Sequence, residues 1–187
     1  IERFEPMYKS YNNNVYMDCY TRMESANDIS TITAPHLVGE DVQIVVDGWE
    51  RPIKKVPPTA IINIDGKCQS VAVGLGYTTK MQIPSIETQV QDGTLLGRLI
   101  TMSRMSMYLL NSHGGKIGKC FGIMDEITLP PKQLFSGDKV CVLPKVGSGW
   151  TTNSSICILH DKPYPFNLLS VTREVEIGGG FPNVTGL

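Results

Sequence analysis

The chain has 187 residues, a formal net charge of −1 and 19% charged residues. This length is enough for one domain, or one domain with a smaller inserted lobe, and for a core that needs no disulfides. The near-neutral charge lacks the basic footprint that tight nucleic-acid binding requires. The 18 glycines and 12 prolines stand mostly at apparent turns and favour short strands over long helices.

The cysteines argue against a disulfide framework or a zinc site, because they are widely spaced, odd in number and never form Cys-x-x-Cys. They are Cys19, Cys68, Cys120, Cys141 and Cys157. We expect buried, reduced thiols, as in a protein that folds in a reducing cytoplasm. No apolar run approaches the length of a membrane span, and no signal-peptide pattern is present. Because the sequence begins with Ile1, we expect a fragment or a processed piece.

The first residues predict little regular structure apart from one strand. Residues 1–14 read as an extended lead-in that ends in three asparagines. Apolar and polar side chains alternate over residues 15–20, which predicts a half-exposed strand. Residues 24–30 are polar, and we expect a loop or one helical turn there.

A set of hairpins follows. Asp47-Gly48 and Asp65-Gly66 are both flanked by β-branched residues, which predicts two tight turns. The strands around them are expected over residues 41–47, 50–56, 60–64 and 68–73. Because such short strands bury little alone, we expect them to curl into a small β-barrel lobe over residues 34–76, inserted into a larger body.

The segment over residues 98–113 is the longest in the second half that is free of glycine and proline. Helical spacing joins Met102, Met105 and Leu109, whereas alternation joins Met105, Met107 and Leu109 on one face. Leucine and methionine favour a helix, but the serines, threonine and tyrosine between them do not. We expect a strand over residues 98–110 that crosses the body, with a helix as the alternative.

Further strands are expected over residues 139–143, 155–160 and 168–177. The predicted fold is therefore mainly β, with a sandwich-like antiparallel body built from residues 15–33 and 77–178. The small barrel lobe interrupts this body, and the glycine-rich residues 179–187 are expected to form a loose tail.

No catalytic constellation emerges from the sequence. His36, His113 and His160 have no metal-ligand spacing and are interpreted as histidines with local hydrogen bonds. Gly147-Ser148-Gly149 lacks the complete nucleophile-elbow pattern, and Gly74-Leu75-Gly76 lacks the third glycine of a dinucleotide site. Asp125 and Glu126 are adjacent, so a strand would point them to opposite faces. We therefore predict no catalytic, cofactor-binding or metal-binding residues.

Two other function classes stay open. A carbohydrate-binding β-sandwich module of a phage or bacterial surface protein would use exposed aromatic side chains, with Trp49, Trp150, Tyr164 and Phe166 as candidates. A hydrolase would require several of the scattered Asp, Glu and His side chains to converge in one pocket.

An ordered series of motifs resembles the distal part of tail nozzle proteins, also called tail tubular protein B, of short-tailed bacteriophages. After the strand at residues 15–20 comes His-Leu-Val-Gly-Glu-Asp-Val-Gln-Ile-Val-Val-Asp-Gly at residues 36–48. Val-Gly-Leu-Gly-Tyr-Thr follows at 73–78, Gly-Thr-Leu-Leu-Gly-Arg at 93–98 and Leu-Leu-Asn-Ser-His-Gly at 109–114. Asp-Lys-Pro-Tyr-Pro-Phe closes the series at 161–166. The resemblance spans about residues 15 to 178 and departs from the family pattern at residues 44–46.

This resemblance implies a structural protein and no enzyme. Its members form a ring, six-fold in this family, below the phage portal and adaptor, and the genome leaves through it. The implied partners are further copies of the chain, the portal or adaptor and other tail proteins. Double-stranded DNA would pass without sequence-specific binding, and no membrane span is implied. The implied location is the virion tail, after synthesis in the bacterial host cytoplasm.

Overall fold

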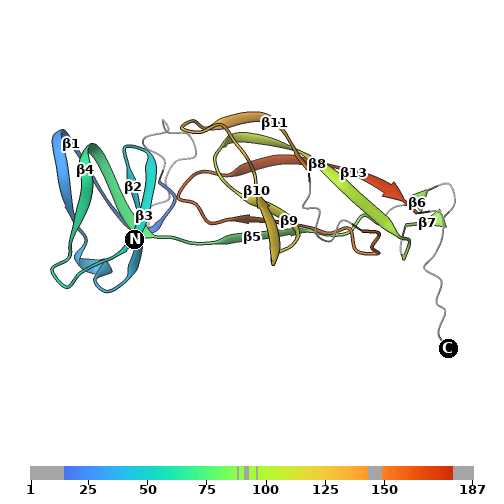
Figure 1. The fold of residues 1–187 in the computed structure, drawn as a ribbon, viewed down its shortest axis with the longest axis horizontal. Helices are drawn as coiled ribbons and strands as arrows, with labels where there is room; N and C mark the ends of the chain where they lie inside the picture. Colours follow the sequence, from blue (N-terminus) through green and yellow to red (C-terminus); the bar gives the residue numbers. More distant parts are fainter. Residues whose placement is uncertain (1–14, 88, 91–92, 96, 143–148, 179–187) are drawn as a thin grey trace.

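A computed structural model describes residues 15–178 with gaps at 88, 91–92, 96 and 143–148. The expected lead-in at residues 1–14 and tail at 179–187 lie outside the described residues. The described part is mainly β and elongated, with a curled sheet at one end of the long axis (Figure 1). Its one helical segment is a single turn of 3-10 helix, η2 (Pro35–Leu37). No described helix has the length and apolar character that crossing a membrane would require.

The first four strands form one antiparallel sheet in the order β1-β4-β2-β3. They are β1 (Asp18–Thr33), β2 (Asp41–Val46), β3 (Trp49–Lys55) and β4 (Ile61–Leu75). The sheet curls into a half-barrel, and its inner face buries aliphatic side chains such as Ile32, Val42, Ile44, Val71 and Val73. We call these strands and η2 the curled-sheet unit. Pro52 lies in β3, an edge strand, where a missing N–H disrupts no inner ladder.

The turn predicted at Asp47-Gly48 is confirmed. Val46 pairs with Trp49, and the two residues between them have φ values of 49° and 81°, as a type I′ hairpin turn requires. The Asp47 side chain also ties this turn to β4. Its Oδ1 accepts hydrogen bonds from the main-chain N–H groups of Gln69 and Ser70, at 3.0 and 2.9 Å.

The turn predicted at Asp65-Gly66 is wrong. β4 runs through this pair without reversing, because β1 lies beside it on both sides, with Thr31 opposite Asn63 and Ile29 opposite Cys68. Residues 64–67 therefore lie opposite Ser30 alone and form a large irregular bulge, in which Gly66 has a φ of +94°.

The same pairing corrects two further expectations. Residues 24–30, expected as a loop or helical turn, belong to β1 and continue it through register shifts. Residues 18–33, expected in the body with residues 77–178, pair with β4 along their length and lie in the curled sheet. In the small lobe expected over residues 34–76, the last two expected strands are thus one strand, β4, and β1 joins the sheet, which is a half-barrel.

The remaining long strands form two more antiparallel sheets, which we call the facing-sheet unit. The order β10-β9-β12-β5 joins Ile123–Glu126, Lys116–Cys120, Ile156–His160 and Thr79–Ile83. The order β11-β8-β13 joins Phe135–Val142, Ile100–Ser112 and Asn167–Ile177. Side chains from both sheets meet in one buried cluster. A two-stranded ladder joins β6 (Gln89–Val90) and β7 (Gly93–Thr94).

The expectation of a strand over residues 98–110 is confirmed by β8, the middle strand of its sheet. Met105, Met107 and Leu109 alternate into the buried cluster and are fully buried. Met102 is also buried, although alternation would place it on the other face. A register shift against β13 between Arg104 and Met102 restores it to the core side, so a bulge produces the helix-like spacing.

The thiols divide into two groups. Cys68, Cys141 and Cys157 are buried, as expected, whereas Cys19 and Cys120 are exposed, and all five are free.

We expect Leu109→Ala to lower the free energy of unfolding by about 2–5 kcal/mol, because the removed side chain leaves a cavity in the buried cluster. Urea denaturation measures the effect. Ser106→Ala, on the opposite face of β8, serves as the control and should change stability by less than about 0.5 kcal/mol. Equal losses in the two variants would contradict the assignment of the buried face.

Candidate functional site

The most elaborate polar contact joins the curled-sheet unit to the facing-sheet unit. The segment after β12, residues 161–164, meets the start of β3 at Glu50. The main-chain N–H of Glu50 donates to Tyr164 Oη at 2.7 Å, and its carboxylate accepts from Lys162 Nζ at 2.7 Å. Gln43 Nε2 donates to the main-chain oxygen of Asp161 at 3.0 Å. One side chain from each unit therefore makes a direct ion pair at this contact.

A second ion pair lies within the facing-sheet unit beside the first. Lys116 Nζ, on β9, is 2.6 Å from Asp161 Oδ2, and both side chains are 31% exposed. The hydrogen bond to Asp161 raises the pKa of Lys116 and holds its ammonium in the charged form. The other carboxylate oxygen, Asp161 Oδ1, is buried and has no hydrogen-bond partner among the described residues.

Aromatic rings border these charges. The ring of His113 meets Tyr164 edge-on, with centroids 4.9 Å apart, and meets Trp49 edge-on at 6.2 Å. Lys132 Nζ lies 5.6 Å from the centre of the Trp49 ring, within cation–π range. Both units thus contribute rings to one cluster, Trp49 from β3 and His113 and Tyr164 from segments that follow β8 and β12.

Two cavities open at this contact and share Glu50, Asp161 and Lys162 in their walls. One has a volume of about 290 Å³ and is also lined by His113, Lys116 and Tyr164. The other, about 460 Å³, lies beside Arg51, Pro52 and Ile53 of β3. The polar contact is therefore open to solvent on two sides.

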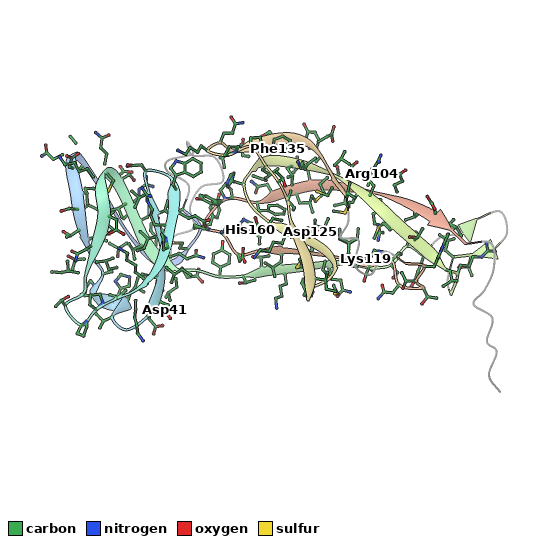
Figure 2. All side chains as sticks on the ribbon, viewed as in Figure 1. Asp41, Arg104, Lys119, Asp125, Phe135 and His160 are labelled. Carbon is green, nitrogen blue, oxygen red and sulfur yellow. The ribbon has the colours of Figure 1, made fainter. Side chains whose placement is uncertain are left out.

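The structure brings together some of the residues that the sequence singled out. His113 and His160 come close, since the ring of His160 is within 3.2 Å of the main-chain oxygen of His113. Figure 2 shows His160 at the end of the facing-sheet unit that is nearest to the curled sheet. His36 is separate, with its Nε2 2.7 Å from the main-chain oxygen of Cys19. Residues 147 and 148 lie outside the described residues.

The four aromatic candidates for sugar binding do not form one platform. Tyr164 is buried and its hydroxyl accepts from Glu50, while Phe166 stacks on His160 at 5.2 Å. Trp49 takes part in the His113 cluster, whereas Trp150 is 51% exposed and lies against Gly178. Asp125 and Glu126 are both exposed on β10, as adjacent strand residues.

Sequence reasoning missed the charged residues of this contact. Glu50 and Lys162 are 112 residues apart, and Lys116 and Asp161 are 45 apart, so no local spacing relates them. A weak signal existed at Gly76, where a β-carbon would lie only 2.5 Å from the Gln43 amide. That glycine leaves room for the side chain that reaches Asp161.

The ion pair and hydrogen bonds of this contact hold the two units together. Each of the two carboxylates at its centre forms an ion pair with a lysine, Asp161 with Lys116 and Glu50 with Lys162. In the part of the chain that the structure describes, no three His, Cys, Asp or Glu side chains gather as a metal site. No family model matches the chain, and the search of curated proteins found no match.

Burial makes the folded protein sensitive to mild acid at His160. Desolvation lowers the pKa of this imidazole, against the opposing effect of its bond to the His113 carbonyl. The unfolded chain therefore binds the proton at a higher pH, and the free energy of unfolding falls as the pH drops below about 6.5. We expect a slope of up to about 1.4 kcal/mol per pH unit, absent in His160→Gln.

Urea denaturation between about pH 5.5 and 7.5 measures this slope, in the range where His titrates. His36→Gln is the matched control, because His36 is exposed, and it should keep the wild-type slope. A wild-type slope that survives in His160→Gln would show that another group carries the pH dependence.

Proposed function

We propose that this chain is a structural component of a bacteriophage tail and forms part of the nozzle tube through which viral DNA is ejected. The ordered motifs between residues 15 and 178 support this family assignment. The described fold is mainly β and antiparallel, as the residue patterns predict, and such a fold suits a rigid structural part. We further propose that the two sheets of the facing-sheet unit form its sandwich-like body, since both contribute to one buried cluster.

The observation that carries the proposal is the outer face of the β11-β8-β13 sheet. Tyr108, Val140 and Val142 point away from the buried cluster and are 42%, 53% and 66% exposed. Both edge strands, β11 and β13, pair on one side only among the described residues. Exposed apolar faces and open edges are typical of surfaces that a partner covers.

Further copies of the chain are the proposed partner for this surface. A head-to-tail contact between unlike surfaces of successive copies closes into a ring when its rotation permits, and the proposed ring is six-fold. The portal or adaptor and other tail proteins would contact its ends. The near-neutral charge suits a conduit, because each tight phosphate contact would slow the passage of DNA.

Purified virions assembled from the genome that encodes this chain test the proposal. We expect mass spectrometry to detect the chain in tails, and electron microscopy to place several copies in a ring below the portal. Absence from the particle, or a single copy on a fibre, would refute the assignment.

The outer face can be tested by substitution. We expect Val140→Asp with Val142→Asp to abolish ring assembly in the presence of the adaptor, because buried carboxylates without partners are strongly disfavoured. Ile53→Asp is the matched control, since Ile53 is 64% exposed on the curled-sheet unit. Native mass spectrometry reports the oligomer, and a ring of normal size from the double variant would contradict the proposed surface.

A further inference from the structure

The two units have separate interiors. The buried cluster of the curled sheet and that of the two facing sheets share no member among the described residues. The chain passes from one unit to the other at residues 76–78, between the end of β4 and the start of β5. Units that meet through a small polar contact are expected to move relative to each other.

The contact that fixes their relative position is small and mainly polar. Residues 161–164 supply one side of it. The other side includes Gln43, Glu50 and the main-chain N–H of Tyr16, which donates to the Pro163 carbonyl at 3.3 Å. The ring of Trp49 adds an edge-on contact to His113 and a cation–π contact to Lys132 beside them. Glu50 contributes twice, through its main-chain N–H to Tyr164 and its carboxylate to Lys162. We call the Glu50–Tyr164 and Glu50–Lys162 bonds the latch.

The latch is accessible to water and ions. The side chains of Lys162 and Glu50 are 34% and 42% exposed, and the two cavities flank them. Ion pairs with this degree of exposure add little to the free energy that holds two parts together, and salt screens them. The hydrogen bond to Tyr164 is more protected, because that ring is buried.

The segment that connects the two units, residues 76–78, is short and forms no strand. The side chain of Gln43 packs directly against Gly76 in this segment. The same side chain donates to the Asp161 carbonyl. Residues 76–78 carry no assigned strand, whereas β4 and β5 on either side are held in their own sheets. Rotation at these residues would break the contacts to residues 161–164 and leave both sheets intact.

We propose that the contact is a conformational latch. While Glu50 holds Tyr164 and Lys162, the curled-sheet unit is fixed on the facing-sheet unit. When the latch opens, the curled-sheet unit rotates about residues 76–78 with both sheets still folded. The device belongs to the chain itself and does not depend on the proposed place in a phage tail.

Spin-label distance measurement across the contact tests the latch. Cys120 is an exposed native thiol on the facing-sheet unit, and Ala26→Cys in a Cys19→Ser background supplies an exposed position on β1. The other three thiols are buried, and burial raises the pKa of each, which slows their labelling. Double electron–electron resonance then reports the distribution of distances between positions 26 and 120.

In the latched parent we expect one narrow distribution at low salt. Glu50→Gln with Tyr164→Phe removes the ion pair and the hydroxyl acceptor, and we expect a second, displaced population of distances. In the single variant Tyr164→Phe, the Glu50–Lys162 ion pair remains. Raising NaCl from about 0.05 to about 0.5 M should increase the displaced population in this variant, because salt screens that ion pair. Circular dichroism verifies that each variant keeps its β-structure.

Lys54→Gln is the matched control. It breaks an exposed pair of similar length, Lys54 to Asp65 at 2.9 Å, that lies wholly within the curled-sheet unit. We expect it to keep the narrow distribution. The proposal is overturned if the double variant also keeps it, if the parent is already broad at low salt, or if Lys54→Gln broadens it equally.

Discussion

The facing-sheet unit depends on one row of side chains, the inward face of β8. Met105, Met107 and Leu109 are fully buried and share one buried cluster with Ile117 and Ile156 of the other sheet. A three-stranded sheet is stable only when one face is covered. This row of side chains therefore holds the two sheets together through their shared buried cluster. Methionine suits the position, since its unbranched chain fills irregular gaps between two twisted surfaces.

Sequence pattern predicted the strands better than their connections. Alternation identified β8, yet a bulge displaced Met102 into the core and imitated a helical repeat. The two Asp-Gly pairs look equivalent in sequence but differ in structure. Asp47-Gly48 turns because β2 and β3 pair with each other, whereas Asp65-Gly66 bulges because β1 accompanies β4 past it. Only the partner strand, remote in sequence, distinguishes these outcomes.

The contact between the units was beyond sequence reasoning for a related reason. Its ion pairs join residues far apart in the chain, and exposed charged residues carry no periodic signal. His113 and Tyr164 were noted separately, but their edge-on contact joins segments that follow two different strands, β8 and β12. Arg173 shows the same limit, since it points inward from β13 and donates to the carbonyls of Pro84 and Ser154.

The order of strand pairing has a consequence for synthesis of the chain on the ribosome. Every strand of the curled sheet has been made by Leu75, so this unit can fold while later residues are still being added. The other unit must wait for β13, whose Ile177 pairs with Ile100. Until then the apolar inner face of β8 lacks one neighbouring strand, and transiently exposed apolar surface of this kind favours aggregation of a nascent chain.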